Sequence, residues 1–370
     1  MGRIIDRGTG IVVEPGDPDE PDPNTIIIPT LRAYIVINDA SLTRVSNNLA
    51  LPATGFSISI DSDSAHWTWS ASLPLRAKGD LEPNAPDELV ELEAMANGAI
   101  WRLLIESIRE DERFGAGSLR IGGRGIAAVL SDPSAPAVAR DNFGAGMTAQ
   151  QIAMDALSIN GTPLGWTLDW QIADWLIPAG VWAHTGTAME AVVRLAEVAG
   201  GYVQAAPATQ SLRVMPRYPV APWEWATAAP AVILPAAAVL ERGAQHIVKP
   251  AYNAVHVAGQ GARGRVVRVG SVGDRPARVI VDDLATHLDA IRGRGISVLG
   301  DTGAQQVTTL ETGILPASGV IHVGTLMDWT RGAVARRGIV RGLSVTVSVP
   351  GLTSNAPLIV RQALEVECHG

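Results

Sequence analysis

Residues 163–219 read PLGWTLDWQIADWLIPAGVWAHTGTAMEAVVRLAEVAGGYVQAAPATQSLRVMPRYP, and this stretch decides the fold. Thr187 and Glu190 stand three residues apart, the spacing of a capping box, in which the hydroxyl accepts a backbone N–H and the carboxylate reaches back to the cap. Apolar residues then recur at helical spacing until Gly200 and Gly201, which supply the left-handed conformation that ends helices. The pattern predicts a short helix with one apolar face.

A second capped helix is expected upstream of this one. Thr148 and Gln151 repeat the capping spacing, and Asn160-Gly161 is typical of a helix end. After the second helix, residues 202–204 and 212–215 predict two strands joined by a turn. Residues 136–219 therefore form an α/β module of about eighty residues, an ordinary size for a small domain.

Composition limits the classes of function. The chain has 370 residues, 47 % of them hydrophobic, which is enough for two or three domains. Its formal net charge of −8 disfavours a phosphate-binding surface as the main interface. Cys368 is the single cysteine, which excludes an intramolecular disulfide, an iron–sulfur cluster and a cysteine-rich zinc site. The most apolar stretch, 228–240, is too short for a membrane span and holds two prolines, so no membrane span is expected.

The remaining sequence predicts two strand-rich units on either side of the module. Strand patterns cover residues 33–37, 55–60, 67–73, 100–108 and 118–130 in the first unit, with a helix after Asp87 that carries Leu89, Leu92, Met95 and Ala96. In the second unit they cover 254–258, 265–269, 277–281, 306–310, 326–329, 341–349 and 358–366, with a helix near 284–291. The expected domains are an N-terminal arm or linker at 1–30, a β unit at 31–135, the module at 136–219, a linker at 220–250 and a second β unit at 251–370.

Two glycine-containing motifs imitate catalytic or nucleotide-binding loops. Residues 259–264, GQGARG, match the dinucleotide fingerprint, but alternating β-branched residues follow where the fingerprint needs a helix, so a β-hairpin turn is favoured. Residues 301–304, DTGA, imitate the aspartic-protease loop without its companion motif, and a polar turn is favoured. The predicted cofactor set is therefore empty.

Other polar groupings are also weak as sites. Asp61, Asp63 and His66 match no defined cation loop and are interpreted as turn residues, and Asn160 as a helix end rather than a glycosylation acceptor. The tryptophans of the module, with its carboxylates, leave a glycosidase or a glycan-binding module as an alternative, because aromatic rings stack on sugars and paired carboxylates cleave glycosides. Trp166 and Trp170 also alternate with polar residues like the buried face of a strand, which favours core packing. No catalytic or metal-binding residue is predicted.

The order and spacing of several stretches resemble those of the central tail hub, or baseplate hub, proteins of long-tailed bacteriophages. The stretches are the Trp-rich module, 56–73, 121–133, 178–180 and 249–255. The resemblance covers about residues 33–367. It implies a mainly β fold with an α/β insertion, in which two tail-tube-like antiparallel β-barrels, each with an embedded helix, stand beside the small module.

The resemblance also implies function. It implies a non-enzymatic structural protein of the virion tail tip, assembled in the host cytoplasm as a homotrimer whose six barrels continue the tail tube. The implied partners are the tail tube or distal tail protein, the tape-measure protein and a tip fibre or spike protein. Genomic DNA would pass through the ring without specific binding.

Overall fold

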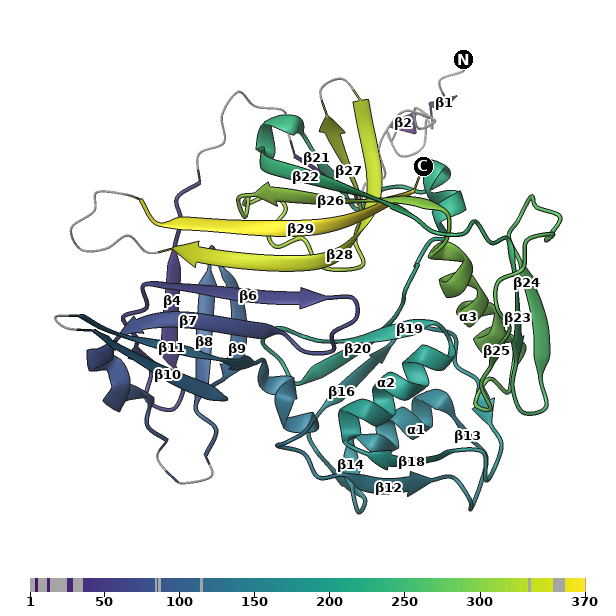
Figure 1. Cartoon of the computed structure of the whole chain (residues 1–370), viewed down its shortest axis with the longest axis horizontal. Helices are drawn as coiled ribbons and strands as arrows, with labels where there is room; N and C mark the ends of the chain where they lie inside the picture. The colour runs from purple at the N-terminus through teal and green to yellow at the C-terminus, as the bar shows by residue number, and fades with distance from the viewer. Residues whose placement is uncertain are drawn as a thin grey trace.

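A computed structural model describes residues 25–28, 36–83, 85, 88–113, 116–331, 334–348 and 357–369, together with the backbone of two short paired strands, β1 (Ile4–Ile5) and β2 (Val12–Val13). The described chain is mainly β, with three α-helices and several short 3-10 helices (Figure 1). Strand-rich elements occupy one part of the molecule, and the α/β module lies beside them. The prediction of a mainly β chain with an α/β insertion is confirmed.

A large antiparallel sheet organises the strand-rich part. Eight of its strands follow one another as hydrogen-bonded neighbours. In spatial order they are β10 (Ser107–Arg113), β11 (Ala116–Arg124), β7 (Thr68–Pro74), β6 (Gly55–Asp61), β28 (Val334–Ser348), β29 (Ile359–His369), β26 (Ala304–Thr312) and β22 (Val239–Val248). Every contact along this path is antiparallel.

These eight strands form two four-stranded units with the same connectivity. In chain order the first unit holds β6, β7, β10 and β11, and the second holds β22, β26, β28 and β29. Across the sheet, both units run third, fourth, second, first. They meet where β6, the first strand of the first unit, pairs with β28, the third strand of the second unit. The chain therefore contains a structural repeat.

A second layer covers one face of this sheet. Its larger part is a four-stranded sheet of β4 (Ala40–Arg44), β5 (Leu49–Ala50), β8 (Glu91–Ala96) and β9 (Ala99–Leu104). The rest is β3 (Ile26–Ile27), β21 (Val232–Leu234) and β27 (Leu326–Arg331), which continue the large sheet from the first half of β28. Apolar side chains on alternate positions, such as Ile58, Trp69, Leu119, Leu343 and Leu364, fill the space between the layers and form one core.

The α/β module folds around its two predicted helices. Capping boxes at Thr148 and Thr187 start α1 (Ala149–Ala156) and α2 (Ala188–Val198), as the sequence predicts. The helices pack on a sheet of β16 (Thr167–Trp170), β20 (Ser211–Pro216) and β19 (Gly201–Ala205). The smaller elements are η2 (Ile126–Leu130), β12 (Val138–Asp141), β13 (Met147–Thr148), β14 (Ser158–Ile159), β15 (Thr162–Pro163), β17 (Leu176–Ile177) and β18 (Ala183–Gly186).

A further piece is inserted between β22 and β26. It consists of β23 (Ala254–Ala258), β24 (Arg263–Val267), β25 (Ile280–Val281) and α3 (Leu288–Gly300), and it shares the core of the module. Gly293 and Gly295 let α3 approach closely, because a Cβ atom at Gly293 would lie 2.4 Å from the carbonyl oxygen of Ala199. Only the second unit carries this insertion, so the two units differ in what lies between their first and second strands.

Some predicted elements differ from the structure. The prediction of a helix after Asp87 is wrong. Residues 91–96 are strand β8, in which every second residue, Leu92, Ala94 and Ala96, is buried. An α-helix embedded in the first unit is therefore absent from its described residues, which contain the short 3-10 helix η1 (Leu75–Leu81) instead. The helix near 284–291 is α3, which begins at Leu288 and packs on the module side rather than inside a barrel.

The segment expected as a linker contains regular structure. Besides β21, it holds η3 (Pro222–Thr227), η4 (Ala236–Ala238) and the ten-residue strand β22. Of the strand predicted at 33–37, residues 33–35 lie outside the described part, and 36 and 37 are in no strand. The other predicted domain limits remain predictions. Hydrogen bonds between β6 and β28 join the two strand-rich units directly.

Candidate assembly interface

The tryptophans of the module belong to its core. Trp166, Trp175 and Trp182 are buried, and Trp170 is half-buried against the same apolar cluster. The indole N–H of Trp175 donates to the carbonyl of Leu284 at 2.9 Å, which ties the module to the inserted piece. These rings do not form an exposed platform on which a sugar could stack.

The carboxylates near these tryptophans have structural partners. Asp174 accepts the backbone N–H of Gln150 in the first turn of α1 at 3.0 Å. Glu190 closes the capping box of α2, and Asp169 accepts from the side chain of Gln171 at 2.6 Å. Helix capping and a local turn therefore account for these three carboxylates.

The two motif-like glycine segments are turns. Residues 259–262 connect β23 to β24 as a β-hairpin, as the sequence predicts, and a Cβ atom at Gly259 would lie 2.2 Å from the carbonyl oxygen of Ala285. Asp301 follows the last turn of α3, where it forms an ion pair with Lys249. Both segments therefore have a structural explanation.

Asp61, Asp63 and His66 serve different contacts. Asp63 forms an ion pair with Arg217 at 2.7 Å, and Asp61 accepts the backbone N–H of Asp63. His66 contacts Ser131 at 2.8 Å, and burial together with nearby Arg124 lowers its pKa to about 4. Within the described residues, no group of three or more His, Cys, Asp and Glu side chains could hold a metal ion. The prediction of Asn160 as a helix end is wrong: α1 ends at Ala156, and Asn160, with a φ of 50°, lies in the tight turn between β14 and β15.

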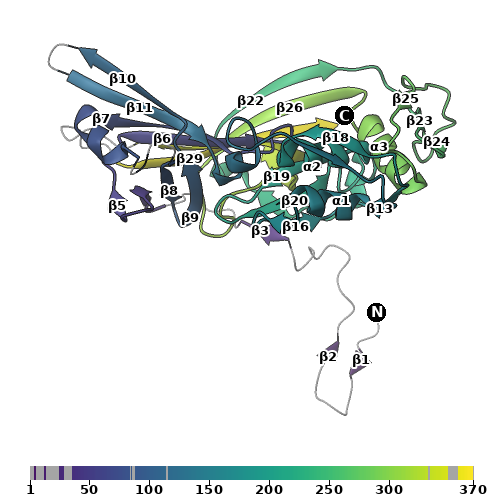
Figure 2. The ribbon, with the colours of Figure 1, turned by 90° about the horizontal axis from the view of Figure 1, so that it is seen from below.

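The face of the eight-stranded path opposite the core is a polar trough, and it is uncovered except at the end of β29, where Tyr218 lies on Glu367. Figure 2 shows the β10–β11 hairpin and the β22–β26 pair bending to the same side, away from the second layer, so that the uncovered face is concave. Its central strands carry small hydroxyl residues at alternate positions: Ser57, Ser59, Thr68, Ser70, Ser72, Thr309, Ser344, Thr346 and Ser348. We call this surface the hydroxyl face. A face of this kind has no apolar area that needs a cover.

Several charged side chains around the hydroxyl face have a partner of opposite sign. Arg361 pairs with Glu311 at 2.5 Å, and Arg124 pairs with Glu106 at 2.6 Å. Of the two Arg-rich stretches of the sequence, 263–268 lies on β24 outside this sheet, and 331–341 lies on β27 and β28. In the second stretch Arg337 pairs with Asp328 and Arg341 with Glu367. The hydroxyl face therefore carries no strong positive field.

Both ends of the eight-stranded path are unpaired on their outer side among the described strands. β10 pairs only with β11, and β22 pairs only with β26. The backbone N–H of Lys249 donates to Gly303 at 3.0 Å, toward β26. Because amides alternate sides along a strand, those of Ala244, His246 and Val248 point outward from the sheet. Such rows of free backbone groups are templates for another strand.

A buried polar network lies at the end of β29 nearest the module. The carboxylate of Glu367 accepts from Tyr218 at 2.6 Å and from Arg341 at 2.8 Å, and it contacts His369 at 2.7 Å. Arg341 also donates to the carbonyl of Arg217 and stacks on the Tyr218 ring. Burial opposes the charge, but these donors together lower the pKa of Glu367 to about 2. The network holds the strand-rich part against the segment that leaves the module.

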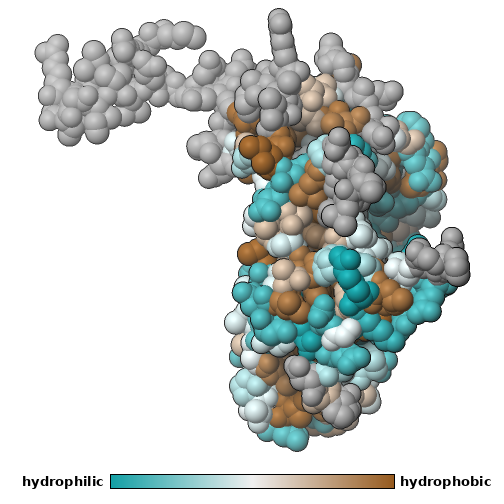
Figure 3. Space-filling model, turned by 90° about the vertical axis from the view of Figure 1, so that its left-hand side faces the viewer, coloured by the Kyte–Doolittle hydropathy of each residue, from teal (hydrophilic) through white to brown (hydrophobic). Residues whose placement is uncertain are grey.

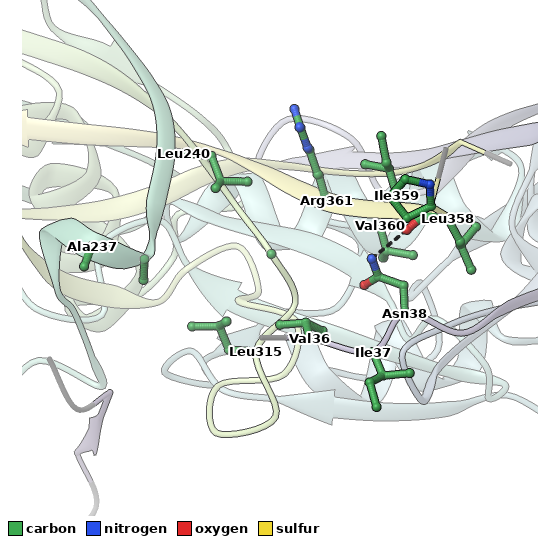
Figure 4. Close-up of a pocket in the computed structure, with 13 residues that line it drawn as sticks. Val36, Ile37, Asn38, Ala237, Leu240, Leu315, Leu358, Ile359, Val360 and Arg361 are labelled. Carbon is green, nitrogen blue, oxygen red and sulfur yellow. Dashed lines mark hydrogen bonds between the residues drawn. The ribbon is translucent and has the colours of Figure 1, made fainter. Parts of the chain in front are cut away.

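An apolar groove of about 700 Å³ lies at the start of β22. Leu240, Leu315, Ile37 and Val360 line it, and Asn38 donates to the carbonyl of Leu358 at 2.8 Å on one side of it (Figure 4). Ile37 is 92 % exposed and Leu240 is 56 % exposed. On the face at the β10 end of the molecule, the coloured apolar and polar residues are interspersed in small patches (Figure 3).

Comparisons with known proteins agree with this architecture. No family model matches the chain, and no curated protein matches it by sequence. Among solved structures, a tail protein from Neisseria meningitidis MC58 superposes with a TM-score of 0.60 at 15 % identity, covering 90 % of this chain and 97 % of that one. The 43 kDa tail protein of prophage MuSo2 from Shewanella oneidensis gives 0.56 at 13 % identity, covering 88 % and 97 %. The chain has the fold of phage tail proteins.

A third similarity extends the comparison to secretion machinery. A component of the type VI secretion system of E. coli, described as structurally similar to T4 bacteriophage tail proteins, superposes with a TM-score of 0.51 at 10 % identity. The alignment covers 86 % of this chain and 74 % of that one. The resemblance to tail hub proteins is thus confirmed for the fold.

The sequence did not reveal the hydroxyl face or the free strand edges, because both depend on strand pairing.

Proposed function

We propose that this chain is a structural protein of a phage tail tip, in which three copies form a ring around the channel through which DNA leaves. The observation that carries the proposal is the repeated four-stranded unit with an uncovered, concave hydroxyl face. A soluble sheet with one polar face and two free edges is suited to form the wall of a water-filled channel. Two such units per chain supply six units from three copies.

The chemistry of the hydroxyl face supports the passage of DNA. Contacts between basic side chains and phosphates bind tightly and would have to break as the polymer slides. Neutral hydroxyls and mutually paired charges offer hydrogen bonds that water replaces easily. A channel lined in this way lets DNA pass without holding it.

The outer elements suit contacts with other tail proteins. The inserted piece, β23 to β25 with α3, is present once per chain, so a ring of three copies would present six similar units inside and three such pieces outside. We propose that the six-unit side adjoins the tail tube or distal tail protein and the tape-measure protein. A tip fibre or spike protein would then adjoin the three-fold side.

Antibody labelling tests the location. Virions of the phage or prophage that encodes the chain are incubated with gold-labelled antibody against the purified protein and viewed by electron microscopy. We expect gold at the end of the tail away from the capsid. Gold along the tube, on the capsid, or only on material that is not part of virions would contradict the proposal.

The described helices include none that is long and apolar enough to cross a membrane.

The alternative of a peptidoglycan glycosidase or glycan-binding module rests on the tryptophans of the module. Trp166, Trp175 and Trp182 are buried, so the structure offers no observation that favours it.

A further inference from the structure

The sheet of the α/β module has two faces that pack on different parts of the chain. Val203 and Val214 point toward the helices and belong to the core of the module, whereas Tyr202 and Met215 belong to the core of the strand-rich part. Because side chains alternate along a strand, Arg213 lies on the same face as Met215. We call the boundary between this face and the strand-rich part the seam.

Three buried polar atoms at the seam have no hydrogen-bond partner among the described residues. They are the hydroxyl of Tyr202, Nε of Arg213 and Nη2 of Arg341. As whole residues, Tyr202 is 7 % exposed and Arg341 is 9 % exposed. Buried polar groups in folded proteins nearly always have a partner, so three unpartnered groups in one region indicate a ligand.

The three side chains reach the seam from both sides. Tyr202 lies opposite Met215 on the paired strands β19 and β20, and Arg213, two residues before Met215, is its diagonal neighbour on the same face. Arg341 comes from β28, and its Nη1 donates to the carbonyl of Arg217, two residues after Met215. Burial raises the pKa of Tyr202, and the nearby positive charges of Arg341 and Arg213 act in the opposite direction. The guanidinium groups and the phenol therefore share one small region.

The seam carries more positive than negative charge. Arg341 and Arg217 each pair with a carboxylate. Arg213 forms no ion pair with a described residue, and its neighbour in register on β16, Asp169, is exposed and accepts from a glutamine side chain. Burial and the charge of Arg213 lower the pKa of His322, which keeps this ring neutral at pH 7. One positive charge at the seam is thus without a counter-charge, which is costly where water is excluded.

We propose that the seam binds a small inorganic anion of the size of chloride, held by the Tyr202 hydroxyl, Arg213 Nε and Arg341 Nη2. The burial of these three atoms leaves no access for a larger ligand. A halide accepts several hydrogen bonds at once and supplies the missing negative charge. A water molecule at the same place would need acceptors for its own hydrogens and would leave Arg213 uncompensated.

The anion would join the module to the strand-rich part. Tyr202 and Arg213 come from β19 and β20 of the module, and Arg341 comes from β28 of the large sheet. A shared acceptor between them fixes the position of one part on the other. The proposal goes beyond the proposed function and does not depend on it.

Thermal unfolding in chloride tests the site. The full chain is measured in sodium gluconate and in mixtures in which chloride replaces gluconate at constant ionic strength, so that screening does not change. We expect a saturable rise in the melting temperature of about 2–3 °C, because a ligand that binds only the folded state stabilises it by mass action.

A single-atom variant assigns the response to the seam. Tyr202→Phe removes only the unpartnered hydroxyl, so we expect its melting temperature in gluconate to equal or exceed that of the wild type and its chloride response to be lost. The control is Tyr252→Phe, which changes a partly buried tyrosine of the inserted piece that packs on the core of the module. This control should keep the chloride response.

A crystal soaked in bromide gives a second readout. We expect an anomalous peak within hydrogen-bonding distance of the Tyr202 hydroxyl and Arg213 Nε. Absence of that peak, with water at the seam instead, would overturn the proposal, and so would a wild-type melting temperature that does not change with chloride. Equal chloride responses in the wild type and Tyr202→Phe would assign the effect to another site and would also overturn it.

Discussion

At the residue scale, Glu367 shows how a buried charge can fasten two parts of the chain. Its carboxylate is almost fully enclosed and is satisfied by Tyr218, Arg341 and His369. A buried ion pair gives little net stability compared with apolar packing, but removal of one partner leaves an uncompensated charge. The network therefore matters more for alignment of β29 with the segment after the module than for total stability.

Replacement of this carboxylate tests that role. We expect Glu367→Gln to destabilise the protein by about 3–5 kcal/mol, because Arg341 is left buried without its counter-charge. The measurement is urea unfolding monitored by circular dichroism at pH 7. The control Glu365→Gln changes an exposed carboxylate two residues away on the same strand and should leave the midpoint unchanged.

The same group predicts a pH dependence. Because the pKa of Glu367 in the folded protein is about 2, below its ordinary value, its contribution to stability is present above the pKa of the unfolded chain and is lost as pH falls toward 2. We expect the wild type to lose stability between about pH 5 and pH 2 more steeply than Glu367→Gln, as measured by unfolding at a series of pH values. Parallel curves for both proteins would contradict the assignment.

Truncation of a tryptophan separates packing from catalysis. Trp182 is 2 % exposed in the core of the module, so Trp182→Ala should cost about 3–5 kcal/mol, as truncation of a buried aromatic residue does. Thermal unfolding measures the loss. Zymography on peptidoglycan is run in parallel, and a variant that kept its melting temperature while losing cell-wall lysis would support the glycosidase alternative.

At the element scale, the sequence predicts those elements whose cause is local. The capping boxes at Thr148 and Thr187 and the hairpin after Ala258 are decided by residues within a few positions, and all three appear as predicted. The prediction of a helix at 89–96 is wrong because the apolar residues of this segment fit a helical stripe as well as an alternating strand. Pairing of β8 with both β4 and β9 selects the strand, and a single sequence does not show that pairing.

The candidate interface could not be predicted from the sequence, because it depends on pairing between strands that are far apart in the chain. β6 and β28 are separated by more than half of the chain, and no local pattern shows that they are neighbours. β22 directly follows residues 216–238, which are rich in alanine and proline and whose composition favours a linker. The hydroxyl residues are ordinary strand residues until the sheet order places them on one uncovered face.

A pair of proline substitutions on β22 distinguishes its inner from its outer amides. Ala244→Pro removes an amide that points away from β26, and edge strands tolerate proline at such positions. We expect this variant to keep its melting temperature within a few degrees and to lose self-assembly, as measured by sedimentation velocity. Gln245→Pro removes an amide that points toward β26 and should destabilise the fold itself, by about 1–3 kcal/mol, because a ladder hydrogen bond is lost. Normal assembly of Ala244→Pro would argue against pairing through this edge.

At the scale of the whole molecule, the account predicts weak binding of DNA. The chain carries a net charge of −8, and its Arg-rich strand β24 stands apart from the hydroxyl face. We expect fluorescence anisotropy with labelled duplex DNA to show no saturable binding at physiological salt. Tight, salt-dependent binding that is lost on substitution of Arg120 or Arg361, which flank the hydroxyl face, would mean that the wall grips the polymer.

The central claim concerns how the two repeated units are used. Each chain holds two similar four-stranded units and a single inserted piece, and we propose that three copies use them as a junction between a six-fold tube and a three-fold tip. The fold, the free edges and the concave hydroxyl face all bear on this one claim.

Electron cryomicroscopy of the intact tail tip measures it most directly. The account predicts three copies of this chain around the tail axis, with Ser59, Thr68 and Ser344 facing the channel. A tip in which the chain has another symmetry, or in which the hydroxyl face points away from the axis, would contradict it.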